Sequence, residues 1–195
     1  MIRFLDILLS FCGLVILSPV MLVISLIIPL DSRGGIFFLQ SRVGKDGNDF
    51  LLVKFRTMAS GADKKGDLTV GKCDSRITRP GYFLRRFKLD EIPQLINVLK
   101  GEMSMVGPRP EIKKYVEMYT EEQKKVLTVR PGITDYASIE YINENEILGS
   151  SENPERTYIE EVMPAKIRLN MQFIEHPTLA NYFHILGKTI SRILF

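Results

Sequence analysis

Residues 7–30 read ILLSFCGLVILSPVMLVISLIIPL, and this stretch from Ile7 to Leu30 contains no charged side chain. As one straight helix it would extend about 36 Å, which is enough to cross a hydrocarbon core of about 30 Å. The overall composition is ordinary, because 195 residues with 45% hydrophobic and 25% charged side chains suit one folded domain. The sequence therefore predicts a folded body attached to a membrane segment.

Three interpretations of this segment compete. A signal peptide needs a positive start and a small-residue cleavage site, but Asp6 accompanies Arg3 at the start and no A-x-A-like site follows. A plain spanning helix is the usual structure of such a run. The third interpretation is a helix that enters the membrane and turns back to the same side.

Ser18-Pro19 lies near the midpoint of the segment and favours the third interpretation. Pro19 cannot donate a hydrogen bond to the carbonyl of Val15, and its ring crowds that carbonyl. Ser18 can bond back to the carbonyl of Leu14, which favours a bend. Each half is then about 17 Å long, too short to span alone. Spanning helices also tolerate proline, so the spanning and re-entrant alternatives both stay open on this evidence alone.

Charge and cysteine usage exclude several function classes. The net charge of +3 is too small to argue for a nucleic-acid partner. Cys12 and Cys73 form no disulfide framework, which fits a reducing compartment. His176 and His184 have no cluster of cysteine or histidine around them, so the sequence gives no indication of a zinc site.

A β-hairpin follows the apolar segment. Ile36–Val43 and Asp49–Arg56 are rich in strand-forming residues, and residues 44–48, GKDGN, supply strong turn chemistry between them. Lys54 and Arg56 are two apart in the second strand and therefore project from one face. That face is either simply solvated or, beside a membrane anchor, able to hold phosphate.

Residues 76–88, RITRPGYFLRRFK, interleave five basic residues, Arg79 and Arg85 among them, with apolar and aromatic ones. The pattern could bind RNA, but it is more typical of a surface that meets anionic headgroups or phosphates. The preceding Ser60–Asp74 is polar and contains glycine, which predicts a mobile loop.

Leu89–Leu99 has the apolar spacing of a helix that ends at Gly101. Asp90 is a fitting N-cap, which would place Asp90 and Glu91 together at the helix N-terminus. Two acidic residues there can be no more than a cap and a charge that stabilises the helix dipole. They can also be a pair of carboxylates available for chemistry.

Pro108 and Pro110 hold Arg109 in a stiff, extended segment, which suits bidentate recognition of a phosphate. Beyond it the sequence predicts a charged helix over Glu111–Val129 and then a loop at residues 129–132, VRPG.

Two further helices are expected towards the C-terminus. The first covers Glu155–Glu175 and is kinked or restarted near Pro164. The second is an amphipathic tail over Asn181–Phe195, with Phe183 and Ile190 on its apolar face. This tail either lies at a membrane interface or packs on the core as an ordinary terminal helix.

Taken in order, these motifs resemble the small monotopic phosphoglycosyl transferases, also called bacterial sugar transferases or undecaprenyl-phosphate sugar phosphotransferases. The resemblance covers nearly the whole chain. Single blocks are weak signals, but the ordered set is highly specific. The blocks are Ser18-Pro19, residues 54–58 (KFRTM), 77–79 (ITR), 84–86 (LRR), 89–95 (LDEIPQL), 97–101 (NVLKG), 103–110 (MSMVGPRP), 129–134 (VRPGIT) and 163–166 (MPAK).

The resemblance implies an α+β, mainly helical fold, with a small β-hairpin and surface amphipathic helices around the active site. Residues 1–33 would form a re-entrant membrane helix that breaks at Ser18 and Pro19. Residues 34–195 would form the catalytic domain at the cytoplasmic face of the bacterial inner membrane. The family would also allow a homodimer, and it gives no reason to expect a nucleic-acid partner.

The resemblance also implies the reaction. Sugar 1-phosphate would pass from a UDP-sugar, of the N-acetylhexosamine type, to polyprenyl phosphate, with release of UMP, as the first step of surface glycan assembly. Asp90 would be the nucleophile, and Asp90 and Glu91 would hold Mg²⁺. Glu91 could instead deprotonate or orient the acceptor phosphate. The expected phosphate-binding residues are Lys54, Arg56, Arg79, Arg85 and Arg109.

The chain departs from the family pattern after Thr134, where an acidic loop from Asp135 to Glu146 is expected to contribute to sugar choice. An alternative function of another class also remains: a non-catalytic, membrane-anchored scaffold of the same fold, whose Asp90-Glu91 pair is only a helix cap.

Overall fold

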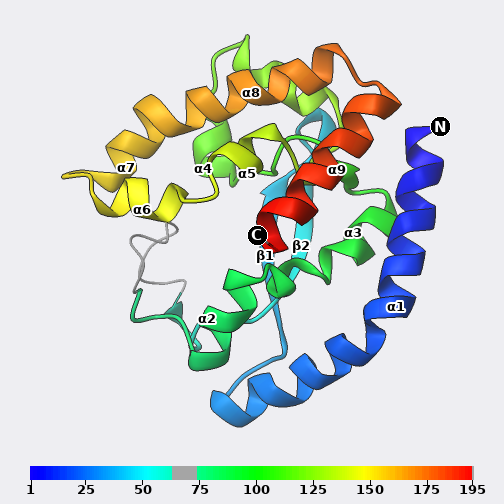
Figure 1. Ribbon diagram of the computed structural model, residues 1–195. Coiled ribbons are helices and arrows are strands. Elements are labelled where there is room, and N and C mark those ends of the chain that lie inside the picture. The colour runs from blue at the N-terminus through cyan, green and yellow to red at the C-terminus, as the bar shows by residue number, and fades with distance from the viewer. Residues whose placement is uncertain (63–73, 195) are drawn as a thin grey trace.

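The computed structural model describes residues 1–62 and 74–194, and it is mainly helical with two small sheets (Figure 1). The strands are β1 (Phe37–Val43), β2 (Asp49–Phe55), β3 (Ser104–Val106) and β4 (Gly132–Thr134). The α-helices are α1 (Ile2–Asp31), α2 (Arg79–Arg86), α3 (Gln94–Lys100), α4 (Lys113–Val116), α5 (Tyr136–Glu140), α6 (Glu144–Gly149), α7 (Pro154–Thr157), α8 (Met163–Glu175) and α9 (Leu179–Leu194). This confirms the predicted mainly helical class. Most of the predicted Ser60–Asp74 loop lies outside the described residues.

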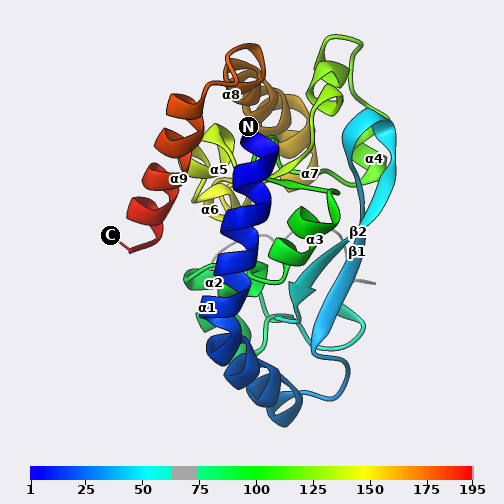
Figure 2. The ribbon, with the colours of Figure 1, turned by 90° about the vertical axis from the view of Figure 1, so that its right-hand side faces the viewer.

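The apolar segment forms one continuous helix, α1, with Pro19 and Pro29 inside it, so the predicted break at Ser18 and Pro19 does not interrupt the helix. Ser18 bonds back to the helix as expected, but its Oγ donates to the carbonyl of Val15, at 2.8 Å, and not to that of Leu14. The helix curves along one side of the body (Figures 1 and 2). Among the described helices it alone has the length and apolarity to cross a membrane, and only 11% of its most apolar stretch is buried.

Both ends of α1 are bonded to the rest of the molecule. Near the N-terminus the Arg3 guanidinium donates to the carbonyls of Val98, at 2.7 Å, and Leu99, at 3.2 Å. At the other end the carbonyls of Ser32 and Arg33 accept hydrogen bonds from Arg56. Free carbonyls at helix ends need such partners, and here an arginine from elsewhere in the chain supplies them.

Asp6 forms a second attachment near the start of α1. Its side chain is buried, with 2% of its surface exposed, and accepts hydrogen bonds from Ser104 Oγ, the Met105 amide and the Tyr182 hydroxyl. A buried carboxylate is stable only with such donors. Asp6 therefore joins α1 to β3 and α9.

The predicted hairpin is confirmed. Strands β1 and β2 pair antiparallel, with Phe37 opposite Phe55 and Val43 opposite Asp49. The turn between them contains Asp46 in the left-handed conformation, where aspartate is one of the better tolerated residues. Phe55, which is buried, packs with the C-terminal half of α1.

Helix α3 is held between the hairpin and α1. Asn97 is fully buried; its Oδ1 accepts from the Val53 amide, at 3.0 Å, and its Nδ2 donates to the Leu51 carbonyl, at 2.8 Å. On the opposite side Gly13 of α1 lies so near Leu95 that an added Cβ would be 3.1 Å from its Cδ1. The segment that carries Asp90 and Glu91 is thereby fixed from both sides.

The second sheet was not predicted. Strands β3 and β4 pair in parallel, with Ser104 opposite Gly132 and Val106 opposite Thr134. The two chains come so close at Gly107 and Gly132 that a Cβ on Gly132 would lie 2.1 Å from the Gly107 nitrogen. The sheet thus joins the MSMVGPRP and VRPGIT segments. Arg109 lies in the segment that leaves the sheet after β3.

The prediction of one helix over Glu111–Val129 is wrong. The structure has only the short helix α4 and a 3-10 helix, η4 (Gln123–Thr128), with a break at Thr120. At that break the Thr120 amide donates to Gln123 Oε1, at 2.9 Å, and the Gln123 amide donates to Thr120 Oγ1, at 3.2 Å. This reciprocal pair is a capping box, which starts a new helical turn and ends the previous one.

The long C-terminal helix is confirmed with an irregularity before Pro164. Helix α7 leads into a π-helical turn, η5 (Tyr158–Val162), and this continues as α8 (Figure 1). In α9, Tyr182 and Ile185 are buried, while Phe183 and Ile190 are 51% and 59% exposed. The tail therefore packs on the core through one face and presents apolar side chains on another. Both predictions, a core-packed terminal helix and a helix at a membrane interface, are compatible with this arrangement.

Candidate active site

Asp90 and Glu91 lie in a short 3-10 turn, η3 (Leu89–Glu91), between α2 and α3. The prediction that Asp90 caps the following helix is wrong, because α3 begins only at Gln94 and Pro93 occupies its N-cap position. Lys88 enters the turn with the left-handed φ of 55°, which is uncommon for a residue with a side chain. Both carboxylates are buried, with 7% and 9% of their surfaces exposed.

Glu91 is held by two cations. Lys54 Nζ lies 3.0 Å from Glu91 Oε1, and the Arg109 guanidinium contacts both carboxylate oxygens. Burial would raise the pKa of Glu91, but Arg109 and Lys54 outweigh it and hold that pKa well below its usual value. The same burial lowers the pKa of Lys54, and Glu91 opposes that change. Glu91 is therefore a fixed anion.

The pKa of Asp90 is shifted in the opposite direction, upwards. Burial raises its pKa and the adjacent Glu91 raises it further, while Lys54, Lys88 and Arg85 act the other way. Its Oδ1 is buried and has no hydrogen-bond partner within the described residues. A buried polar atom without a partner is costly, so Asp90 has an unused acceptor for a ligand.

Arg85 is positioned by the block that follows β2. Its Nε donates to Thr57 Oγ1, at 2.8 Å. Helix α2 approaches Thr57 so closely that a Cβ on Gly81 would lie 2.2 Å from the Thr57 carbonyl oxygen. Only glycine permits this approach, which brings Arg85 near enough to Asp90 to oppose the rise in its pKa.

The structure thus brings together Asp90 and four predicted partners, which are Glu91, Lys54, Arg85 and Arg109. It does not place Arg56 with them, because that guanidinium bonds to the carbonyls of Ser32 and Arg33 at the end of α1. Arg79 is exposed at the start of α2. The shared strand face expected for Lys54 and Arg56 therefore does not make a common site.

Comparison with known proteins decides the family. The model of the bacterial sugar transferase family matches residues 1–195, which is the whole chain. The chain belongs to this family. It is 35% identical over 195 residues to the UDP-N-acetylgalactosamine-undecaprenyl-phosphate N-acetylgalactosaminephosphotransferase of Aeromonas hydrophila, a match that covers 98% of this chain and 43% of the relative.

Two further relatives match this chain over fewer residues. It is 46% identical over 120 residues to a putative undecaprenyl-phosphate N-acetylgalactosaminyl 1-phosphate transferase of Bacillus subtilis, covering 62% of this chain and 67% of that protein. It is 42% identical over 137 residues to the UDP-glucose:undecaprenyl-phosphate glucose-1-phosphate transferase of Escherichia coli, covering 69% and 30%. The chain thus spans less than half of the Aeromonas and Escherichia proteins.

Asp135 was expected only as the start of a loop, and its contact with Arg109 was not predicted. The expected acidic loop is instead two helices, α5 and α6, and Asp135 is a buried N-cap of α5 that accepts from the Ser138 amide. The same carboxylate accepts from the Arg109 amide, at 2.9 Å, and so fixes the arginine backbone. The sequence feature that could have indicated this role is the position of Asp135 just before a helix, where a short acidic residue is a common N-cap.

A magnesium ion would need ligands from outside the protein. The described residues contain no group of three or more His, Cys, Asp or Glu side chains that could enclose a metal. Mg²⁺ commonly binds through one or two carboxylates together with substrate phosphates. The unpartnered Oδ1 of Asp90 and the remaining lone pairs of Glu91 fit that mode, since each carboxylate has about four acceptor positions.

Proposed function

We propose that this chain transfers a sugar 1-phosphate from a UDP-sugar to polyprenyl phosphate, and thereby initiates assembly of a surface glycan. The observation that carries the proposal is the buried Asp90, whose Oδ1 lacks a partner in the described structure, beside a carboxylate neutralised by Lys54 and Arg109. The names of relatives from three organisms, which describe undecaprenyl-phosphate sugar phosphotransferases, support the same reaction.

Two displacements at one phosphorus would make up the reaction. An Asp90 oxygen attacks the β-phosphorus of the UDP-sugar, and the bond to the bridging oxygen breaks, so that UMP leaves and an acyl phosphate forms. An oxygen of polyprenyl phosphate then attacks the same phosphorus. The bond to Asp90 breaks, which regenerates the carboxylate and releases polyprenyl diphosphate-sugar. The aspartate splits one difficult transfer into two steps.

The neighbouring side chains would support both steps by position and charge. Arg85, beside Asp90, is suited to phosphate oxygens, because guanidinium groups bind them in pairs. Glu91, whose pKa is held low, is a poor proton acceptor, and we assign it to orienting Arg109 and Lys54 and to holding metal. Charge is then stabilised in a site that is already ordered.

Asp90 and Glu91 are the residues that would hold Mg²⁺, together with oxygens of the donor diphosphate. When bound, the ion would offset the negative charge of the diphosphate beside two carboxylates. The protein's own part is to supply an unoccupied acceptor at Asp90 and to keep Glu91 ionised.

We further propose that α1 is re-entrant in the bacterial inner membrane, with the catalytic body at the cytoplasmic face. Support comes from the attachment of both helix ends to that body, through Arg3 and Asp6 at one end and Arg56 at the other. This arrangement would place the site where a polyprenyl chain can stay in the bilayer while its phosphate reacts. A homodimer remains a prediction.

The donor is proposed to be an N-acetylhexosamine derivative. The relative matched over 98% of this chain is named for N-acetylgalactosamine, and so is the Bacillus relative. The Escherichia relative, matched over a smaller part of this chain, is named for glucose. We therefore expect UDP-N-acetylgalactosamine or UDP-N-acetylglucosamine to be used in preference to UDP-glucose.

The test is release of UMP by the purified full chain in detergent, given Mg²⁺, undecaprenyl phosphate and each UDP-N-acetylhexosamine. We expect Asp90→Asn to lower the rate by about 1,000-fold or more, because the amide cannot form the acyl phosphate. Asp46→Asn makes the same change at an exposed turn residue and serves as the matched control. Chelation by EDTA should abolish the wild-type rate.

A wild-type rate in Asp90→Asn would refute the nucleophile assignment. An undiminished rate in EDTA would refute the metal assignment. If the wild-type protein released no UMP from any UDP-sugar, the alternative of a non-catalytic membrane scaffold would replace the proposal.

A further inference from the structure

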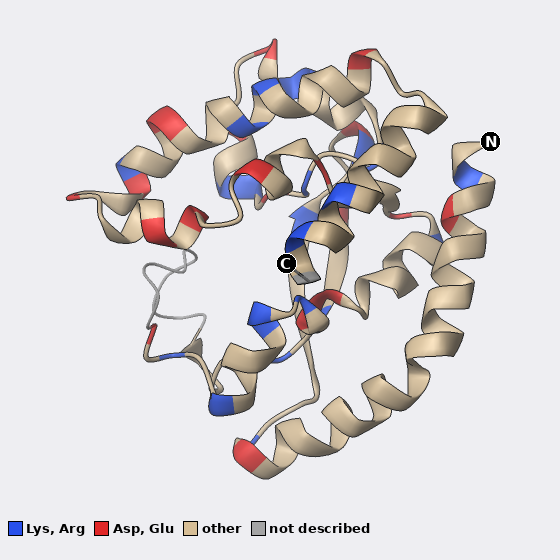
Figure 3. Ribbon diagram, viewed as in Figure 1, with Lys and Arg blue, Asp and Glu red and all other residues tan. Residues whose placement is uncertain are grey.

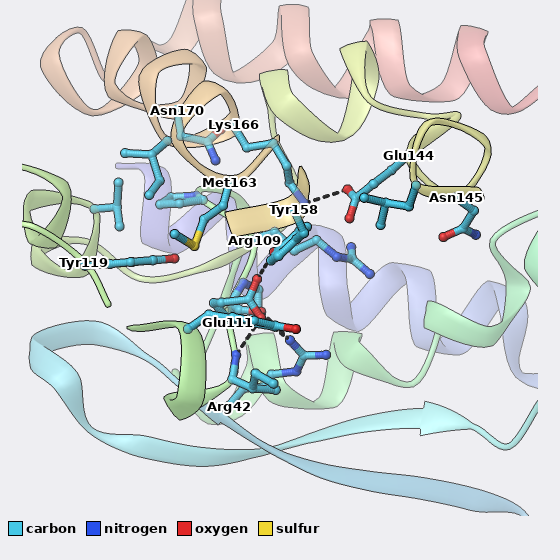
Figure 4. A pocket seen from close by; sticks show the side chains of 17 residues that line it. Arg42, Arg109, Glu111, Tyr119, Glu144, Asn145, Tyr158, Met163, Lys166 and Asn170 are labelled. Atoms are coloured by element: carbon cyan, nitrogen blue, oxygen red, sulfur yellow. Dashed lines mark hydrogen bonds and ion pairs between the residues drawn. The ribbon is translucent and has the colours of Figure 1, made fainter. Parts of the chain in front are cut away.

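A cavity of about 220 Å³ includes Arg109 of the candidate active site in its wall, and Figure 4 shows the side chains that line it. Its wall comes from β1, from the chain that follows β3, and from α4, α6 and α8. Arg109 forms part of this wall and also binds Glu91, so this side chain connects the cavity to the candidate active site. The other lining residues on which the inference depends are Arg42, Glu111, Glu144, Asn145, Lys166 and Asn170.

The charged groups of the wall are paired. Arg42 binds Glu111 at 3.1 Å, and Lys166 binds Glu144 at 2.7 Å, as the dashed lines in Figure 4 show. Arg109 binds Glu91. A wall of paired charges offers many hydrogen-bond donors and acceptors but little net charge. It is therefore suited to an uncharged polar ligand better than to a diphosphate, which favours cations that are not already paired.

Asn170 adds an acceptor that no other side chain uses. It is buried, with 6% of its surface exposed, and its Nδ2 donates to Asp135 Oδ2 at 2.9 Å. Because a carboxylate requires a donor, this bond fixes which end of the amide faces Asp135. The other end, Oδ1, is buried and has no partner in the described part of the chain. A hydroxyl or amide N–H of a ligand in the cavity would satisfy it.

The size of the cavity restricts the ligand further. Pockets for ligands of ordinary drug size run from about 300 to 1,000 Å³, so 220 Å³ is too small for a whole nucleotide sugar. It is ample for one sugar ring, since a single water needs only about 10–15 Å³ of cavity volume measured in this way. A ring in this cavity would extend from Arg109, which lies next to the carboxylates where the phosphorus would react.

We propose that this cavity binds the sugar ring of the donor and that Asn170 and Asn145 contact the ring and set the choice of sugar. The inference rests on the proposed function and deepens it. Asn170 acts from the buried wall. Asn145 is exposed and lines the mouth of the cavity on α6. A site that hydrogen-bonds a substrate group rejects analogues that lack it, because its own buried polar atoms are then left without partners.

The experiment compares kcat/KM for UDP-N-acetylgalactosamine, UDP-N-acetylglucosamine, UDP-galactose and UDP-glucose, and the inhibition constant of UMP, in the full-length protein. We expect Asn170→Leu to lower kcat/KM for the best donor by about tenfold, to reduce the ratio of best to worst donor by a similar factor, and to leave the UMP inhibition constant within twofold. Asn145→Ala, at an exposed position, should reduce the same ratio by about threefold with no effect on folding. Glu152→Gln, exposed beyond the cavity wall, is the control and should change neither quantity.

Two results would overturn the inference while the proposed function stands. An unchanged donor ratio in both variants, with all donors slowed equally or not at all, would show that the cavity has no part in sugar choice. A weaker inhibition constant for UMP would show that the cavity holds the nucleotide. Failure of the wild-type protein to release UMP from any donor is a different result, which concerns the proposed function itself. If Asn170→Leu failed to fold, Asn145→Ala would still decide between these outcomes.

Discussion

Asp90 and Glu91 are adjacent in the sequence, but their surroundings shift their pKa values in opposite directions. Burial and the neighbouring carboxylate raise the pKa of Asp90, whereas Arg109 and Lys54 overcome burial and lower that of Glu91. One carboxylate is thus strained as an anion and the other is stabilised as one. A group held at a free-energy cost is commonly part of the chemistry, and a neutralised neighbour commonly positions it.

Stability should show this difference. Glu91→Gln leaves Lys54 and Arg109 without their carboxylate and should lower the free energy of unfolding by about 2–4 kcal/mol at pH 7. The loss is smaller than for a fully buried pair because the Arg109 side chain is 33% exposed. Asp90→Asn removes an anion that burial disfavours and should leave Tm unchanged or raise it. Thermal unfolding of both variants in one detergent measures the difference.

The pH dependence follows from the sign of the shift. A carboxylate whose folded pKa is lowered stabilises the fold above its unfolded pKa, near 4.5 for glutamate, and loses that effect as pH falls through the folded value. The Tm difference between wild type and Glu91→Gln should therefore be constant at neutral pH and shrink only below pH 4.5. A difference that vanished between pH 6 and 7 would contradict the assignment of a lowered pKa.

Most of the candidate site could be predicted from the sequence, because its residues lie in short ordered motifs. Asp90, Glu91, Lys54, Arg85 and Arg109 all meet in the structure. Arg56 could not be separated from Lys54 by spacing alone, since alternation in a strand gives direction and not the partner. Asn170 carried no local signal, because its role depends on Asp135 and on a cavity that forms only when distant segments pack.

At the scale of elements, the hairpin and the C-terminal helices could be predicted from local sequence patterns, whereas two other features could not. The parallel pair β3 and β4 has only three residues in each strand, and the strands are separated by several helical turns, so no local pattern marks it. The helix expected over Glu111–Val129 was interrupted by the side chains of Thr120 and Gln123, which cap a new turn. Charged runs without an apolar face are weak evidence for continuity.

The buried hydrogen bonds of Asp6, which link α1 to β3 and α9, can be tested by substitution. Asp6→Ala removes the acceptor of Ser104, of the Met105 amide and of Tyr182, all in a buried region, and should cost about 3–5 kcal/mol. Tyr182→Phe removes one of these bonds and serves as the graded comparison, at about 1 kcal/mol. For a chain of this length these losses correspond to Tm decreases of roughly 6–20 °C and 2–4 °C. Equal effects of the two variants would show that the carboxylate does not link the three elements.

For the whole molecule, the course of α1 restricts how the protein can sit in a bilayer. Side chains on its outer face, such as Phe11, Ile16 and Leu22, are 59%, 72% and 63% exposed, which suits contact with lipid. Charged residues occur at its two ends and not between them (Figure 3). A straight spanning helix would separate those ends by about 45 Å and place them on opposite sides of the membrane.

Placing the two ends of α1 in opposite compartments conflicts with the contacts that both ends make. Arg3 and Asp6 bond to α3, β3 and α9, while the carbonyls of Ser32 and Arg33 bond to Arg56 directly after the hairpin. These elements form one body, and the polar hydrogen-bonding groups of that body would have to cross the hydrocarbon if the two ends faced opposite compartments. We therefore expect both ends to face the cytoplasm.

Cysteine labelling in intact bacteria can decide this. In a chain with Cys12 and Cys73 changed to serine, Phe4→Cys and Arg33→Cys place single thiols at exposed positions near the two ends of α1, and Glu152→Cys places one on the catalytic body. A membrane-impermeant maleimide should label none of the three in intact cells and all three after the membrane is dissolved in detergent. Labelling of one α1 end but not the other in intact cells would establish a spanning helix, and the bonds of Arg3, Asp6 and Arg56 could then not exist together in the membrane.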